Sequence, residues 1–105
     1  MTPVAGIDLQ KMNDAAERAS ALMKTLAHKG RLMILCQLAE GEKSVGELSR
    51  LLAMPQSPLS QHLSRMRSEN LVATRRDAQT IYYCLESQEV AAVIGCLYAL
   101  YCAPD

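Results

Sequence analysis

The chain contains no tryptophan and no phenylalanine, and only four tyrosines supply aromatic surface. Half of its 105 residues are nevertheless hydrophobic, so the core has to be built mainly from leucine, alanine, methionine and valine. A composition of this kind favours helices over strands. A chain of this length is expected to form one domain, residues 1–105, around a single core.

Long apolar runs are also missing. The most apolar segment, Val90 to Ala103, has about 14 residues, whereas a helix that crosses a membrane needs roughly 20. The first residues, MTPVAGID, lack the basic start and apolar stretch of a secretory signal. We therefore expect a cytoplasmic protein with no membrane partner. There are four cysteines but no CxxC pair, and cytosolic cysteines are kept reduced, so a structural disulfide framework is not expected.

The chain has no net charge, with 11 basic and 11 acidic residues, which argues against a protein that coats nucleic acid without selection. These charges are unevenly distributed. Residues 43–80 hold six basic and three acidic side chains, and the rest of the chain carries the balancing negative charge. The basic segment is therefore the first place to look for contacts with nucleic acid.

The segment from Met54 to Arg67, MPQSPLSQHLSRMR, is predicted to form a short amphipathic helix within this basic region. Ser57 is expected to cap it, with Pro58 as its first helical residue. Its polar face can read base edges in the major groove, and its arginines can reach phosphates, although a solvated surface helix shows the same pattern. The apolar stripe is Leu59, Leu63 and Met66, and the opposite face holds Ser57, Gln61, Ser64 and Ser68, with Arg65 and Arg67 nearby.

Two helices are predicted at the start of the chain. The first begins after a capping residue, Asp8, and runs to about Ala27, with apolar side chains at steps of three and four along about five turns. One small domain seldom needs so long a leading helix for its own core, so we expect part of this stripe to pack on a second copy of the chain. The segment 28–31 interrupts the pattern, and a second helix follows from Leu32 to Ala39, before Gly41.

A third helix is predicted to begin at Ser44 and to end near Ala53. Ser44 and Glu47 have the spacing of a capping box, in which each side chain accepts from the other residue's backbone N–H. Pro55 stops this helix, and the helix that starts at Ser57 follows after a short turn. Two short helices joined in this way form a helix-turn-helix motif, whose second helix enters the major groove of DNA.

A β-hairpin is predicted after the helix-turn-helix. The segments Leu71 to Thr74 and Thr80 to Leu85 are short and rich in β-branched or aromatic residues. The tip between them contains Arg75 and Arg76, which suits contact with the phosphate backbone or the minor groove. A solvated hairpin tip is the alternative interpretation.

The last helix is predicted to start after a capping residue, Ser87, and to carry an apolar stripe from Val90 to Tyr101. Small residues on a second face, Ala91 and Gly95, allow another helix to approach closely. We therefore expect the last helix to share a dimer contact with the first.

This order of elements resembles the winged-helix repressors of the arsenic-repressor (ArsR) family. The resemblance is carried by Met23 to Leu35, by SVGELSRLL at Ser44 to Leu52, by SPLSQHLSRMR at Ser57 to Arg67 and by LVATRRDAQTIYYCL at Leu71 to Leu85. It implies a mainly α fold with a β-hairpin: a dimeric winged helix-turn-helix of about five helices plus a two-stranded wing. It also implies a homodimeric repressor, not an enzyme, that occupies a palindromic operator in double-stranded DNA and releases it when an inducer binds.

The resemblance further implies that the polar face of the second motif helix and the wing contact the operator. His62 has an equal alternative as a packed histidine, because it is three residues after Leu59 and four before Met66. The residues that we expect to contact DNA are Gln56, Ser57, Ser60, Gln61, His62, Ser64, Arg65, Arg75, Arg76 and Gln79.

The positions of two cysteines match a subgroup of the family, the persulfide and polysulfide sensors of the BigR and SqrR type. The resemblance implies that Cys36 and Cys102 are the sensing dithiol and that a small reactive sulfur species is the inducer, which bridges them. Metal-sensing members of the family commonly carry two cysteines in the first helix of the helix-turn-helix. The corresponding residues here, 47–51, contain no such ligand pair, so no metal or cofactor is expected. Another thiol oxidant, or a soft metal held by thiolates, stays open as the inducer.

Three competing interpretations also stay open. The first is that Cys36 and Cys102 are ordinary small core residues, as free cysteines often are, and we interpret Cys84 and Cys96 as structural. A cytosolic thiol oxidoreductase is the alternative from another functional class, but the sequence offers no CxxC pair, no strand and helix alternation and no catalytic constellation in its favour. The third is a dimeric module that binds other proteins through its apolar last helix.

Overall fold

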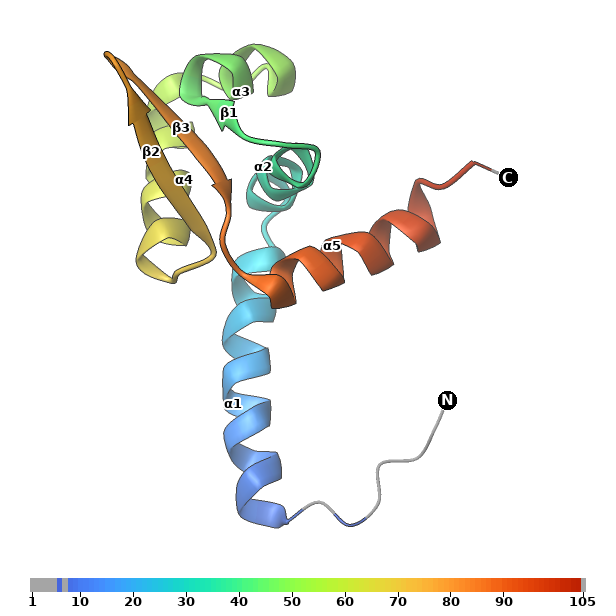
Figure 1. Cartoon of the computed structure of the whole chain (residues 1–105). Coiled ribbons are helices and arrows are strands. Elements are labelled where there is room, and N and C mark those ends of the chain that lie inside the picture. Colours follow the sequence, from blue (N-terminus) through green and yellow to red (C-terminus); the bar gives the residue numbers. More distant parts are fainter. Residues whose placement is uncertain (1–5, 7, 105) are drawn as a thin grey trace.

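The computed structural model describes residue 6 and residues 8–104 of the chain. Within these residues the fold contains five helices and three strands, and the prediction of a mainly α winged helix-turn-helix is confirmed (Figure 1). The elements are α1 (Leu9–Leu26), α2 (Lys29–Ala39), β1 (Lys43–Ser44), α3 (Val45–Leu52), α4 (Gln56–Ser68), β2 (Val72–Asp77), β3 (Thr80–Leu85) and α5 (Gln88–Tyr101).

The core lies where α2, α3, α4 and the start of α5 meet the sheet. The predicted stripe of α4, Leu59, Leu63 and Met66, is fully buried there. α3 is fixed by the predicted capping box, because Ser44 and Glu47 each accept a hydrogen bond from the other's backbone N–H, at 3.2 and 3.0 Å. Close packing on one side therefore holds the helix-turn-helix in place. The core of the fold consists of Leu26, Ile34, Leu35, Leu38, Leu48, Leu59, Leu63, Met66, Leu71, Val72, Val90 and Ile94.

The predicted two-stranded wing is present as β2 and β3, and one correction to the sheet is a third, shorter strand, β1, in the antiparallel order β1-β3-β2. The short strand β1 pairs with the outer edge of β3, because the capped start of α3 brings residues 43–44 beside residues 82–83. A second correction concerns the tip. Arg75 and Arg76 belong to β2, since that strand keeps pairing with β3 as far as Asp77, and the connection is only Ala78 and Gln79.

The start of α4 also differs from the prediction. Pro55, not Ser57, is the N-cap residue, the helix begins at Gln56, and no side chain caps it. Pro58 thus lies third in the helix instead of first. A proline is tolerated at this position because the first four backbone N–H groups of a helix have no partner within the helix.

α2 begins three residues earlier than the sequence suggested. His28 is its N-cap, and the His28 Nδ1 accepts a hydrogen bond from the Gly30 N–H at 3.0 Å. Arg31, in the first turn, is buried, and its Nε donates to the Thr25 backbone oxygen at 2.9 Å. The predicted break between the two helices is therefore present but shorter, at Ala27 and His28, and Arg31 lies in α2, where it satisfies a carbonyl in the last turn of α1.

Two helices project from the body as arms (Figure 1). Only the end of α1 is buried, at Thr25 and Leu26, while Leu9 is 78% exposed. α5 buries Val90 and Ile94 but leaves Tyr101 82% exposed. Both apolar stripes are thus covered near the body and open farther out. Among the described residues, no helix has the length and apolar character needed to cross a membrane.

Candidate nucleic-acid interface and thiol pair

The polar face of α4 is free in the single chain. Six residues that the sequence assigned to DNA contact lie on this helix with exposed side chains, and three of them, Ser57, Gln61 and Ser64, are on the side opposite the buried stripe. Because the stripe packs against α2, α3 and β2, the polar face has a fixed direction in the molecule. Such a face can hydrogen-bond base edges without any rearrangement of the fold. The six residues are Gln56, Ser57, Ser60, Gln61, Ser64 and Arg65.

His62 differs from these neighbours because it is half-buried and packs on another histidine. Its ring centroid lies 4.6 Å from that of His28, the N-cap of α2. Burial lowers the pKa of His62, and the positive charges of His28, Arg31 and Arg65 lower it further. The contact favours the alternative of a packed histidine, in which His62 joins the recognition helix to the start of α2.

The wing lies beside α4, and its two arginines are in different environments (Figure 1). Arg76 and Gln79 are exposed, and neither side chain has a hydrogen bond or ion pair within the described residues. Arg75 donates from Nε to both carboxylate oxygens of Glu42, at 2.9 Å each, and also pairs with it through a terminal guanidinium nitrogen. The hydrogen bond from Arg75 holds the pKa of the Glu42 carboxyl below its usual value.

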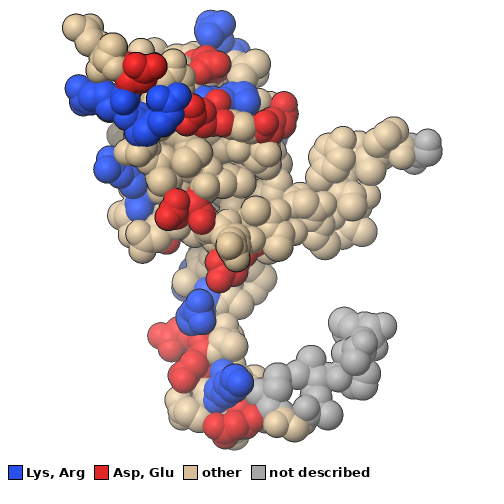
Figure 2. Space-filling model, viewed as in Figure 1, with Lys and Arg blue, Asp and Glu red and all other residues tan. Residues whose placement is uncertain are grey.

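Basic side chains gather over the end of the molecule that carries the wing and α3, where acidic side chains also occur (Figure 2). In the same view the projecting part of α5 shows no charged residue. Charged side chains of both signs therefore lie at the end with the wing and along α1, and the uncharged surface in this view is the arm of α5. The end with the wing can approach a phosphate backbone, whereas the arm of α5 suits an apolar partner.

A polar network at the end of α4 could not be found from the sequence. The Thr25 hydroxyl, in the last turn of α1, donates to a Glu69 carboxylate oxygen at 2.8 Å. The other Glu69 oxygen lies 3.7 Å from the Nε of Arg65. Through Thr25 the network reaches Arg31, which binds the Thr25 carbonyl. These contacts join residues up to 44 positions apart, and no local pattern signals such a pairing.

The two cysteines of the predicted sensor lie on elements that pack together, Cys36 on α2 and Cys102 at the C-cap of α5. Both are free thiols with exposed side chains in the single chain, which does not support the alternative of ordinary core residues. Partial burial raises the pKa of the Cys36 thiol, and the negative charges of Cys102 and Glu40 raise it further. The two thiols are thus close enough for Cys102 to affect the pKa of Cys36.

The remaining cysteines are separate from this pair. Cys84 lies in β3 and is half-buried, whereas Cys96 is exposed on α5, so the interpretation of Cys96 as a core residue does not hold for the single chain. Within residues 6 and 8–104, no three histidine, cysteine, aspartate or glutamate side chains are grouped closely enough to hold a metal ion.

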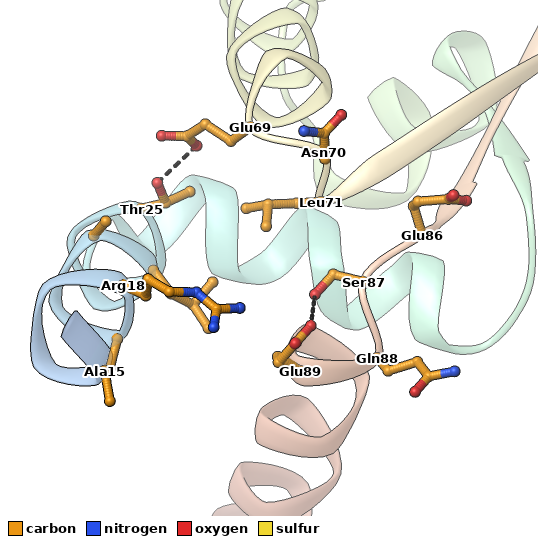
Figure 3. Close-up of a pocket in the computed structure, with 13 residues that line it drawn as sticks. Ala15, Arg18, Thr25, Glu69, Asn70, Leu71, Glu86, Ser87, Gln88 and Glu89 are labelled. Carbon is orange, nitrogen blue, oxygen red and sulfur yellow. Dashed lines mark hydrogen bonds between the residues drawn. The ribbon is translucent and has the colours of Figure 1, made fainter. Parts of the chain in front are cut away.

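An open cleft of about 850 Å³ lies between α1, the end of α4 and the start of α5 (Figure 3). Arg18 points across it from α1. Hydrogen bonds from the Glu89 backbone N–H and the Ser87 hydroxyl lower the pKa of the Glu89 carboxyl, and the positive charge of Arg18 makes a smaller contribution in the same direction. Neither Cys36 nor Cys102 lines this cleft, and no side chain of the polar face of α4 does. It is a feature of the junction between the two arms.

Comparison with known proteins agrees with this geometry. Residues 28–74, from the N-cap of α2 into β2, match the family described as bacterial regulatory protein, arsR family. The chain is 49% identical over 98 residues to the transcriptional activator HlyU of Vibrio cholerae, covering 93% of this chain and 91% of that protein. The structure of reduced HlyU from the same organism superposes with a TM-score of 0.87 over 90% of this chain and all of that one.

Two other solved structures are similar. The transcriptional repressor BigR of Xylella fastidiosa is 39% identical, with a TM-score of 0.83 over 93% of this chain and 100% of BigR. A homodimeric winged helix-turn-helix DNA-binding domain from Mycobacterium bovis is 28% identical, with a TM-score of 0.75 over 92% of this chain and 89% of that domain. These similarities extend beyond the helix-turn-helix into both arms.

Proposed function

This chain belongs to the ArsR family of bacterial regulatory proteins and is a transcriptional regulator, not an enzyme, and on that premise we propose that it is a homodimeric, sulfur-responsive repressor. It reads a palindromic operator in double-stranded DNA with α4 and the wing. It releases the operator when reactive sulfur bridges Cys36 and Cys102. The observation that carries the DNA-binding part is the exposed polar face of α4 above a fully buried apolar stripe.

The reading of DNA follows from the position of α4 in the fold. As the second helix of the motif, it presents Ser57, Ser60, Gln61 and Ser64 to the major groove, where amide and hydroxyl groups can distinguish bases. Arg65, Arg67 and Arg76 are exposed around this face and supply phosphate contacts. Gln56 and Gln79 lie at its two margins, at the start of α4 and the turn of the wing.

The proposed homodimer rests on the arms. Each arm carries large apolar side chains that are more than half exposed in the single chain, Leu9 and Met23 on α1 and Tyr98, Leu100 and Tyr101 on α5. Exposed apolar surface of this extent marks an interaction site. The structural relative from Mycobacterium bovis is a homodimer, and a two-fold dimer matches a palindromic operator.

The switch uses ordinary thiol chemistry. A thiolate attacks a sulfane sulfur of a polysulfide and becomes a persulfide, and the second thiol then closes the bridge. Two thiols and one tetrasulfide dianion give a tetrasulfide link and two hydrosulfide ions, so the polysulfide is the oxidant and protons and charge balance. A bridge of several sulfurs also relaxes the limit of about 7 Å between the Cα atoms of a disulfide.

The bridge acts on DNA binding through the arms. Cys102 ends α5, which is proposed to build the dimer contact, and Cys36 lies on α2, which packs against the helix-turn-helix. Linking the two fixes the arm relative to the body and so changes the distance between the two recognition helices. A dimer whose helices no longer match the half-site spacing loses both major-groove contacts at once.

The experiment combines a chemical and a binding measurement on the purified protein. After treatment with tetrasulfide, intact-mass and peptide mass spectrometry should find Cys36 and Cys102 joined by added sulfur. The same sample should lose its affinity for the operator in a fluorescence anisotropy assay. Cys36→Ser and Cys102→Ser should stay bound to the operator under the same treatment.

Cys96→Ser is the matched control, because Cys96 is also exposed on α5 but is six residues from Cys102 and so lies on a different face of the helix. This variant should respond to tetrasulfide as the natural chain does. The sulfur hypothesis fails if the double variant at positions 36 and 102 still releases DNA. Release by hydrogen peroxide alone, or by cadmium alone, would replace the sulfur inducer with another oxidant or a soft metal.

A further inference from the structure

Arg75 is bound within the protein on two sides, unlike the other arginines near the proposed DNA surface. Its guanidinium engages the Glu42 carboxylate in a forked arrangement and lies over the Tyr82 ring, with the guanidinium carbon 4.6 Å from the ring centroid. Tyr82 is its direct partner across the β2-β3 ladder, and Glu42 comes immediately before β1. One side chain therefore links β2 to β3 and to the residue that precedes β1.

The pleat of β2 separates Arg75 from Arg76. Successive side chains of a strand point to opposite faces of the sheet. Arg76 pairs with Ile81, two residues from Tyr83, which packs against the core, so Arg76 shares that face and Arg75 lies on the other with Tyr82. The two neighbouring arginines consequently cannot play the same part in one DNA contact.

We propose that Arg75 is a positioning residue for DNA binding: its guanidinium stays on Glu42 and Tyr82 in the complex, fixes the angle of the wing, and leaves Arg76 to contact phosphate. This inference rests on the proposed DNA-binding function. Arginine suits the task because its planar fork binds a carboxylate through two parallel hydrogen bonds while its face stacks on an aromatic ring. The negative charge of Glu42 keeps the site from attracting a phosphate.

The salt dependence of DNA binding separates the two roles. Each phosphate contact contributes about 0.9 to the slope of log affinity against log salt concentration. Arg76→Ala should therefore lower the slope by roughly 1.8 for a dimer, which loses two contacts. Arg75→Ala should weaken operator binding several-fold at every salt concentration and leave the slope unchanged. An equal loss of slope in both variants overturns the proposal.

Glu42→Gln provides a test by the sign of its effect. If Arg75 positions the wing, Glu42→Gln weakens operator binding as Arg75→Ala does, because each removes one half of the same contact. The double variant should then be no weaker than either single variant. If Arg75 instead contacts phosphate, Glu42→Gln frees the guanidinium and tightens binding, which overturns the proposal.

A measurement without DNA keeps this inference separate from the proposed function. Amide hydrogen exchange in β2 and β3 of the free protein should be faster in Arg75→Ala and in Glu42→Gln than in the natural chain, and unchanged in Arg76→Ala. Absence of DNA binding by the natural chain would defeat the proposed function. Exchange that is equal in all four proteins would show that Arg75 holds nothing and would defeat this inference alone.

Discussion

The helices α4 and α1 have the same kind of apolar pattern, but the stripe of α4 is buried and most of the stripe of α1 is exposed. The stripe of α4, Leu59, Leu63 and Met66, is completely buried, whereas Leu9 and Met23 of α1 are 78% and 61% exposed. Both helices repeat apolar residues at steps of three and four. The difference lies in what faces the stripe: α4 meets its own domain, and α1 meets solvent (Figure 1).

An amphipathic pattern therefore predicts that the apolar face of a helix packs against another surface. It does not predict whether that surface belongs to the same chain or to a second copy. Exposed apolar residues on α1 and α5 are costly for a monomer unless another surface covers them. The head, which we define as α2, α3, α4, the sheet and the buried start of α5, should therefore be stable by itself. The burial of the projecting parts of α1 and α5 should depend on protein concentration, because a second copy of the chain has to supply it. The predictions below separate these two kinds of stability.

The largest effect is expected where a charge is placed on an arm. Tyr98→Glu would bury two carboxylates in a two-fold interface. Each should weaken dimer formation by about 1–3 kcal/mol, so the dimer should lose about 2–6 kcal/mol of association free energy. Sedimentation equilibrium should show that the variant dimer dissociates at a much higher protein concentration than the natural dimer. Gln88→Glu, at the exposed start of the same helix, is the control and should leave the dimer intact. Unchanged dissociation of Tyr98→Glu would place the interface elsewhere.

Within the head, Leu63→Ala should lower the free energy of unfolding by about 2–5 kcal/mol, because it leaves a cavity at a fully buried position. Leu51→Ala is the matched control. Leu51 is 57% exposed on α3, and its truncation should change stability by less than about 0.5 kcal/mol. Urea unfolding followed by circular dichroism measures both. Equal costs for the two variants would contradict the division between buried and exposed faces.

A smaller effect is expected at the polar face of α4. Gln61→Ala should weaken binding to the operator by about 1–3 kcal/mol if Gln61 hydrogen-bonds a base edge. Binding to random-sequence DNA should hardly change, because Gln61 carries no charge. Anisotropy titrations with both duplexes at one salt concentration give the two numbers. A similar loss on both duplexes would mean that Gln61 supports the helix and does not read sequence.

The smallest effect is expected from His62. Burial lowers its pKa in the folded chain below the ordinary value of 6.5, so the unfolded chain takes up the proton more readily. The stability that the neutral ring contributes is therefore present above pH 6.5 and is lost as the pH falls toward the folded pKa. Urea unfolding between pH 7.5 and 5.5 should show this decline, and His62→Gln should flatten it. An identical decline in both proteins would exclude His62 as its source.

Much of the fold could be predicted because its signals are local. The capping box of Ser44 and Glu47, the stripe of α4 and the strand from Thr80 to Leu85 depend on neighbouring residues, and each is confirmed. The cap of α4 at Ser57 was wrong, because Pro58 fits anywhere in the first helical turn and Pro55 takes the capping position. The start of α2 was wrong because Arg31 binds the end of α1 across the turn.

The proposed DNA-binding site could be predicted only in part, because only some of its features have local signals in the sequence. Spacing along α4 identifies a polar face, and the structure leaves that face exposed. The unequal roles of Arg75 and Arg76 have no local signal, since Glu42 lies 33 residues from Arg75 in the chain. The pairing of Thr25 with Glu69, 44 residues apart, is equally absent from any local pattern.

The sequence by itself determined the five helices and the β-hairpin, the apolar face of the helices and where positive charge collects, because propensity, capping and periodicity act over a few residues. Only the tertiary structure decided which of those faces the chain covers by itself, which arginine is bound within the wing and that Cys36 lies near Cys102. These outcomes depend on contacts between distant segments, whose geometry is set by packing of the whole core and not by any one stretch of sequence.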